Sequence, residues 1–195
     1  MHNKLINAGL GSIMGALVGD AAGAYLEFLG RAPSDQEIDR AMSLPGGGTW
    51  NVAHGQITDD GELTLCLAQA LLESRGFDIE TVARWYAKWF ASPPFDIGNT
   101  TRSSIGCVMH MDVETLTRNK QFAESMTRAA AAKCRGSMAN GSLMRISPLG
   151  AWGHSLPNAE LARLAGLDSS LSHPNETCCH AVGAYCIAIA ELVRH

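Results

Sequence analysis

Three consecutive residues with oxygen-bearing side chains, Thr58, Asp59 and Asp60, form the strongest chemical signal in the sequence. They lie in a turn between Gly55 and Gly61, just before a strongly apolar segment. Hard divalent cations such as Mg²⁺ and Mn²⁺ prefer oxygen ligands of this kind. Thr and Asp are also preferred at the N-cap of a helix, although a cap needs only one of them. The residues by themselves therefore leave metal ligation and capping open.

Further acidic residues could belong to the same site. Asp20 and Glu27 are seven residues apart, so in a helix their side chains share one face. Each could be a solvated acid, and Asp20 could instead bind loop amides. Asp96 follows the pair Pro93-Pro94, where a helix must end, and Asp96 or Asn99 could simply cap the next helix.

A loop of small residues, Gly136 to Ser142, precedes a short apolar segment. Backbone amides in such a loop can bind a diphosphate, and the N-terminus of a following helix adds a favourable dipole. The loop lacks the Gly-Lys-Ser/Thr ending of a Walker loop. His173, between Ser172 and Pro174, is by itself typical of a loop residue bonded to backbone, and His54 is expected to be structural or peripheral.

The elements that must position these residues are helices, because apolar residues recur at helical spacing almost throughout. We expect an all-α orthogonal multi-helix bundle in a single domain over residues 1–195. Four glycines at intervals of four residues suggest either that another backbone packs closely on the first helix or a chance pattern. These glycines are Gly11, Gly15, Gly19 and Gly23. We expect helices over about 4–28, 113–133, 157–171 and 175–194, and a short helix inside 136–150. Three further helices are expected to begin near Asp59, after Asp78 and after residues 99–101, the second of them ending before Pro93.

Composition excludes several classes of protein. The net charge is −4 and no run of Lys or Arg appears, so nucleic acid is not expected as a partner. Glycines and Asp20 interrupt the apolar N-terminal run, which argues against a membrane span. Six cysteines are present without a C-x-x-C pair, as expected for reduced thiols in a cytoplasmic protein.

Three blocks of sequence, in this order, resemble the ADP-ribosylglycohydrolase family: Gly19–Glu27, Gly55–Glu62 and Asn140–Gly150. The resemblance implies that family's all-α fold and a hydrolase that removes ADP-ribose from modified protein side chains. It implies two Mg²⁺ or Mn²⁺ ions held by Thr58, Asp59 and Asp60. Glu27 is then a candidate general base, and Asp96 a residue for positioning substrate or for acid/base chemistry. The residues implied to bind ADP-ribose are Gly136, Ser137, Asn140, Gly141, Ser142 and His173.

One expected segment is missing. The family pattern includes a later D-x-D-[ST] segment that completes the metal centre, and no Asp-x-Asp occurs after Asn140. The chain could be truncated at its C-terminus, which we favour because the retained motifs are intact. A partner or a second copy could instead complete the site, or the protein could be a non-catalytic ADP-ribose-binding or crystallin-like relative. Truncation predicts an exposed apolar surface that promotes dimerisation or another partner. The motifs do not distinguish arginine from serine linkages, or Mg²⁺ from Mn²⁺.

Overall fold

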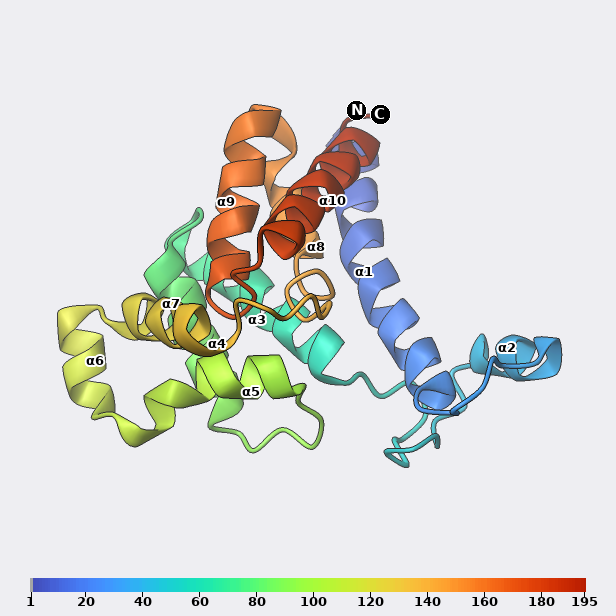
Figure 1. Ribbon diagram of the computed structural model, residues 1–195. Helices are drawn as coiled ribbons and strands as arrows, with labels where there is room; N and C mark the ends of the chain where they lie inside the picture. Colours follow the sequence, from blue (N-terminus) through green and yellow to red (C-terminus); the bar gives the residue numbers. More distant parts are fainter. Residues whose placement is uncertain (1) are drawn as a thin grey trace.

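The computed structural model describes residues 2–195, apart from the side chains of His2 and His110. Within this range the chain forms α-helices and short 3-10 helices and no sheet, which confirms the all-α prediction (Figure 1). One isolated bridge joins Gly47 and Val52. The α-helices are α1 (His2–Leu26), α2 (Asp35–Ala41), α3 (Asp59–Ser74), α4 (Ile79–Phe90), α5 (Asn99–Ile105), α6 (Val113–Asn119), α7 (Phe122–Lys133), α8 (Ser147–Trp152), α9 (Asn158–Ser170) and α10 (Glu176–Arg194), and the 3-10 helices are η1 (Gly106–His110) and η2 (Gly153–Ser155).

The main core lies where α3 and α4 pack together and meet α9, α10 and the segment leading into α8. Helices α9 and α10 run side by side, and α1 passes along the other flank of α10 toward α2 (Figure 1). The two ends of the chain lie close together, and the Lys4 ammonium contacts the carbonyl of His195. The core includes the side chains of Leu63, Leu67, Val82, Tyr86, Ile105, Met126, Ile146, Leu149, Leu161 and Val182.

The predicted and observed helices differ at two places. The helix predicted from Val113 to Lys133 is interrupted at Lys120, where φ is +53°, and continues as α7 after Gln121. Helix α2 was not predicted, although Ser34 and Glu37 form a capping box at its start. Both errors concern short helices whose ends are decided by one or two residues.

Helix α1 leaves much of its surface uncovered. Its side chains Ile6, Leu10, Met14 and Val18 are each 42–57% exposed. The prediction that a backbone packs against the glycine stripe is wrong for the described chain, because a Cβ added at any of the four glycines would meet no atom within 4 Å. This face agrees with the expected exposed apolar surface.

By length and composition alone, the α1 segment Asn3–Leu26 and helix α10 could each cross a membrane. Packing accounts for part of the apolar sequence of α10, of which 39% is buried, whereas only 6% of the α1 segment is buried. Helix α10 contacts α8 and α9, and α1 contacts α3 and α8. The mostly buried core helices of soluble proteins and signal sequences near an N-terminus pass the same test of length and composition.

Candidate functional site

Most of the predicted site residues line a cavity of roughly 200 Å³, and Thr58, Gly136, Ser137 and Ser142 lie outside its lining. The end of α1, the start of α3, the segment leading into α5 and the loop before α8 all contribute to its wall. Four carboxylates line one part of the cavity, and small or polar residues line the rest. The carboxylates are Glu27, Asp59, Asp60 and Asp96, and the remaining lining residues are Phe28, Gly98, Asn99, Thr100, Thr101, Ala139, Asn140, Gly141, Met144 and His173.

The start of α3 is held by a carboxylate from α1. Asp20 accepts hydrogen bonds from the backbone N–H groups of Thr58 and Gly61, both at 2.8 Å, and from the Thr58 hydroxyl at 2.7 Å. Thr58 is the N-cap residue and makes no capping bond with its own side chain. Asp20 therefore does what a cap does, and the Asp59 and Asp60 carboxylates are left to line the cavity.

Gly61 is required by this arrangement. A Cβ at this position would lie 2.6 Å from Oδ2 of Asp20 and 2.8 Å from Cβ of Ile57. The glycine lets α1 approach the first turn of α3. The Gly55–Glu62 block thus combines two carboxylates with the small residue that allows their helix to be capped from outside.

Burial, together with repulsion between neighbouring carboxylates, raises the pKa values of the cavity acids. Burial, followed by the charge of Asp96, raises the pKa of Asp59 to about 6, and burial, followed by the charge of Asp59, raises that of Asp60 to about 7. Burial is also the main reason that the pKa values of Glu27 and Asp96 are raised. No Lys or Arg lines the cavity to offset these charges. Such a site favours a bound cation.

The donor set fits Mg²⁺ or Mn²⁺ in chemical type. The Thr58 hydroxyl gives its hydrogen to Asp20 and keeps oxygen lone pairs, and Asp59 and Asp60 supply carboxylate oxygens. In the described part of the chain, however, no three Asp, Glu, His or Cys side chains are grouped as metal ligands usually are. Metal ligation by Thr58, Asp59 and Asp60 stays a prediction, and a complete centre needs further ligands.

The residues of the predicted substrate loop lie in different surroundings. Asn140 and Gly141 line the cavity, as does His173. Ser137 lies behind the wall, where its hydroxyl is 2.8 Å from that of Thr100. Ser142 is buried, and its hydroxyl is 2.9 Å from that of Ser169. Gly136 is exposed and outside the lining.

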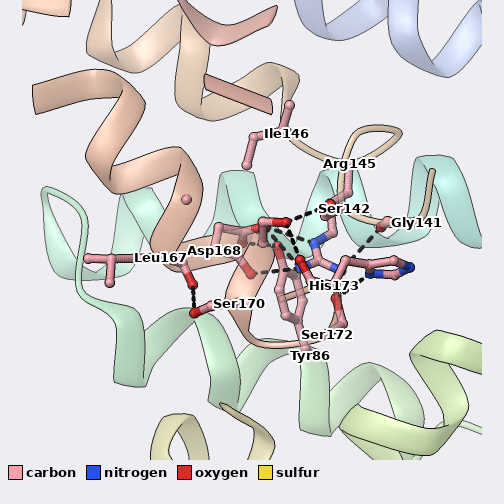
Figure 2. Close-up of polar contacts among 12 residues, drawn as sticks. Tyr86, Gly141, Ser142, Arg145, Ile146, Leu167, Asp168, Ser170, Ser172 and His173 are labelled. Carbon is pink, nitrogen blue, oxygen red and sulfur yellow. Dashed lines mark hydrogen bonds and ion pairs between the residues drawn. The ribbon is translucent and has the colours of Figure 1, made fainter. Parts of the chain in front are cut away.

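A fully buried ion pair between Arg145 and Asp168 holds this loop in place (Figure 2). The Arg145 guanidinium donates to Asp168 Oδ2 at 3.0 Å, to the Gly141 carbonyl at 3.2 Å and to the Ser172 hydroxyl at 2.8 Å. Tyr86 donates to the other oxygen of Asp168 at 2.7 Å, and its ring lies 4.5 Å from the guanidinium carbon. Arg145 thereby joins the loop to the segment that carries His173.

Sequence reasoning gave Arg145, Asp168 and Tyr86 no role. Arg145 stands inside the Asn140–Gly150 block, which was a usable signal. Nothing local identified its partner, because Asp168 is 23 residues away on α9.

His173 packs directly against the loop. Its Nδ1 is 2.9 Å from the Ser172 hydroxyl, and burial, followed by the charge of Arg145, lowers its pKa to about 4. The ring is therefore neutral near pH 7. A Cβ on Gly141 would lie 2.6 Å from Cε1 of His173, so only glycine lets the ring and the loop approach this closely.

Comparison with known proteins identifies a family that matches the whole chain and relatives that match all or part of it. Residues 1–195 match the family described as ADP-ribosylglycohydrolase. The ADP-ribosyl-[dinitrogen reductase] glycohydrolase of Rhodospirillum rubrum is 31% identical over 188 residues, which are 95% of this chain and 56% of that protein. The ADP-ribosylarginine hydrolase Tri1 of Pseudomonas putida (strain GB-1) is 36% identical over 102 residues, 49% of this chain and 26% of that protein.

A solved structure has the same arrangement of helices. It is described as an ADP-ribosylglycohydrolase-related protein complex, with a TM-score of 0.76 and 26% sequence identity. The match covers 100% of this chain and 58% of the other. The chain thus spans little more than half the length of relatives that it matches along nearly its entire length.

Proposed function

The chain belongs to the ADP-ribosylglycohydrolase family, and we propose that it provides the metal-binding and ADP-ribose-binding part of a hydrolase that removes ADP-ribose from modified protein side chains. The observation that carries the proposal is the shared cavity. Four carboxylates without a basic neighbour in the lining face a glycine-containing loop and a neutral histidine. This arrangement can place a diphosphate sugar beside an acidic centre.

The roles follow from position in the cavity. Asn140 and Gly141 bind the diphosphate and the adjoining ribose, and His173 holds the loop in shape. Glu27 is half-buried beside Asp59 and Asp60, and its raised pKa suits a group that accepts a proton from an attacking water. Asp96 positions the reacting end of the substrate. Thr58, Asp59 and Asp60 would hold Mg²⁺ or Mn²⁺, which supplies Lewis acidity toward ribose or water oxygens when bound.

A complete metal centre needs further ligands, because no three Asp, Glu, His or Cys side chains of the described residues are grouped to hold an ion. Glu27 and Asp60 also line a second, open hollow of roughly 340 Å³ against α1, which Asp20 and Thr58 border. A further segment, a partner or a second copy of this chain could add carboxylates there. The relatives' additional length is the source that we favour, and the exposed face of α1 beside the hollow would be covered at the same time. Residence in the cytoplasm stays a prediction.

A second candidate function is ADP-ribose binding without turnover. The grouping of ligands supports it, since the described residues provide no complete metal cluster. In that case the protein binds ADP-ribose and releases none from a modified protein.

The test is release of ADP-ribose from arginine-linked and serine-linked protein substrates in Mg²⁺, in Mn²⁺ and in EDTA. We expect cation-dependent release that Asp59→Asn and Asp60→Asn abolish. Glu124→Gln, a change to an exposed acid on α7, serves as the control and should behave like the unchanged protein. ADP-ribose affinity measured by calorimetry separates the candidates: binding without release supports the second function, and neither binding nor release excludes both.

A further inference from the structure

An apolar groove lies between α4 and the segment formed by η1, α6 and the start of α7. Its volume is roughly 350 Å³, and its floor is formed by the buried side chains of Ala87, Val108 and Phe122. At its rim Met109 is 45% exposed and Val113 is 61% exposed. Large apolar side chains exposed around a recess need an explanation, because burial is their ordinary state. We call this feature the α4–α6 groove.

The α4–α6 groove is separate from the surfaces described above. None of its lining residues lines the acidic cavity or the open hollow against α1. Figure 1 shows α6 and α1 on opposite sides of the helical bundle. An inference about the groove therefore stands independently of the proposed hydrolase.

The charged side chains in the lining of the groove are Arg84 and Lys88. They are four residues apart on α4, so they share one face of that helix. Arg84 forms an ion pair with Glu73. Lys88 belongs to no ion pair among the described residues, and its ammonium lies 4.6 Å from the centre of the Trp85 ring. The groove thus combines an apolar interior with a cation at its edge.

The acidic side chains on the neighbouring elements have other partners. Glu73 accepts hydrogen bonds from Arg84 and from the Trp85 indole. Glu80 accepts from the first two backbone N–H groups of α7, at 2.8 and 2.9 Å. Asp112 caps the start of α6. Since no Asp or Glu of the described residues lines the groove, its positive edge is suited to an anion.

We propose that the α4–α6 groove binds an amphiphilic monocarboxylate, with its aliphatic chain between α4 and α6 and its carboxylate paired with the Lys88 ammonium. The volume of the groove falls within the range of roughly 300–1,000 Å³ that is typical of small-molecule pockets. The chain covers Met109 and Val113, and this burial supplies the hydrophobic part of the binding free energy. The flexible stem of Lys88 lets its ammonium turn from the Trp85 ring to the carboxylate.

Calorimetry with octanoate, 1-octanol and acetate tests the two parts of this proposal. We expect octanoate to bind, 1-octanol to bind about 10-fold more weakly because it lacks the charge, and acetate to give no measurable heat because it lacks the chain. Lys88→Met keeps an apolar stem and removes the charge, so the affinity for octanoate should fall by about 10-fold. Arg118→Met, at an exposed arginine of α6 outside the lining, is the control and should leave the affinity unchanged. No binding of octanoate, equal affinities for octanoate and 1-octanol, or an unchanged affinity in Lys88→Met overturns the proposal.

A second pair of variants tests the position of the ligand. Thr117 is exposed on α6 and lines the groove, so Thr117→Phe places a ring there and should abolish octanoate binding. Arg118→Phe introduces the same ring one residue later, outside the lining, and should bind octanoate normally, with circular dichroism checking that both variants stay helical. Binding that survives Thr117→Phe overturns the proposal, because octanoate then lies on another apolar surface, such as the exposed face of α1. A dimer that Thr117→Phe dissociates in analytical ultracentrifugation also overturns it, since the groove is then an interface between two copies of the chain.

The Trp85 indole N–H resonance reports the position of Lys88 without any substitution in the groove. Octanoate should shift this resonance as the ammonium leaves the ring, and Trp85→Phe identifies the signal. The resonance of Trp152, on α8 and outside the groove lining, should stay in place. An unshifted Trp85 signal at saturating octanoate, or an equal shift of both signals, contradicts the pairing of the carboxylate with Lys88.

Discussion

Asp20 and Thr58 are joined by two hydrogen bonds, from the Thr58 backbone N–H to Oδ2 and from the Thr58 hydroxyl to Oδ1. They are 38 residues apart in sequence, on α1 and at the N-cap of α3. The same carboxylate also accepts from Gly61. One side chain of α1 thus fixes the helix start that carries Asp59 and Asp60, so the geometry of the acidic centre depends on how α1 docks.

We predict that Asp20→Asn destabilises the protein, because the side chain holds the start of α3. Asparagine has one acceptor oxygen and no charge, so at least one bond from the first turn of α3 is lost. Loss of a part-buried hydrogen bond to a charged group costs about 1.5–3 kcal/mol. Urea unfolding measures the change, and Asp39→Asn, at an exposed position on α2, is the control. Equal stability of the two variants would show that α3 is capped without Asp20.

We predict that the cation-free protein becomes less stable as pH rises, because the carboxylates of the cavity lose their protons. The folded-state pKa values of about 6 for Asp59 and about 7 for Asp60 lie above the ordinary value of 3.8. Between pH 4 and pH 7 the folded chain therefore holds protons that the unfolded chain has released. The free energy of unfolding in EDTA falls as pH rises through this range, by several kcal/mol in all, because a difference of one pKa unit corresponds to about 1.4 kcal/mol.

Two controls test the source of this pH dependence. Asp60→Asn removes part of it and makes the cation-free protein more stable at pH 8, because one buried charge is gone. Mg²⁺ or Mn²⁺ should stabilise the unchanged protein at pH 8, and this variant less. Thermal unfolding followed by circular dichroism gives both results. A stability that rises with pH would show that the carboxylates are not desolvated.

The sequence predicted what is local. The start of α3, the end of α4 before Pro93 and the presence of α10 follow from turns, prolines and apolar spacing. The break at Lys120 was missed because residues 113–133 contain no glycine or proline, and the αL conformation there is adopted by a lysine. Local pattern cannot report a helix end that tertiary packing decides.

Part of the candidate site was predicted from the sequence, whereas Thr58, Gly136, Ser137 and Ser142 lie outside the cavity lining. Asp59, Asp60, Glu27, Asp96, Asn140, Gly141 and His173 all line one cavity, as the resemblance implied. For Asp20 the sequence left a solvated acid and a bond to loop amides open, and the structure shows the second. The pair Arg145–Asp168 was missed because it joins distant segments, and polar residues seen singly in sequence resemble a solvated surface. The glycine stripe of α1 is the reverse case, since its spacing predicted a contact that the described chain does not make.

Arg145→Lys should loosen the loop that contains Gly141. The lysine keeps the charge and loses the forked donors that reach Asp168, Gly141 and Ser172 together. Disrupting a buried pair costs about 3–5 kcal/mol when a charge is left unpaired, so the conservative variant should lose about 2–3 kcal/mol. Chemical unfolding and ADP-ribose calorimetry measure stability and affinity. Arg163→Lys, in the exposed pair with Glu160, is the control. A similarly small loss of stability in both variants would show that the buried contacts of Arg145 do not hold the loop.

Gly141→Ala tests whether contact between the loop and His173 shapes the binding site. The new Cβ would lie 2.9 Å from Nε2 of His173 and 3.1 Å from the Thr101 hydroxyl, and the buried ring has little space to retreat. Overpacking of this kind costs about 1–3 kcal/mol, and we expect ADP-ribose affinity to fall by about 10-fold as the loop shifts.

Gly136→Ala is the matched control for this change. It lies in the same predicted loop, outside the cavity lining, and an added Cβ there meets no atom within 4 Å. Calorimetry with ADP-ribose should therefore find the Gly136 variant unchanged and the Gly141 variant weakened. Equal losses of affinity would mean that the whole loop from Gly136 onward contacts the ligand, and not only the part that lines the cavity. Two unchanged affinities would move the diphosphate away from Gly141 altogether.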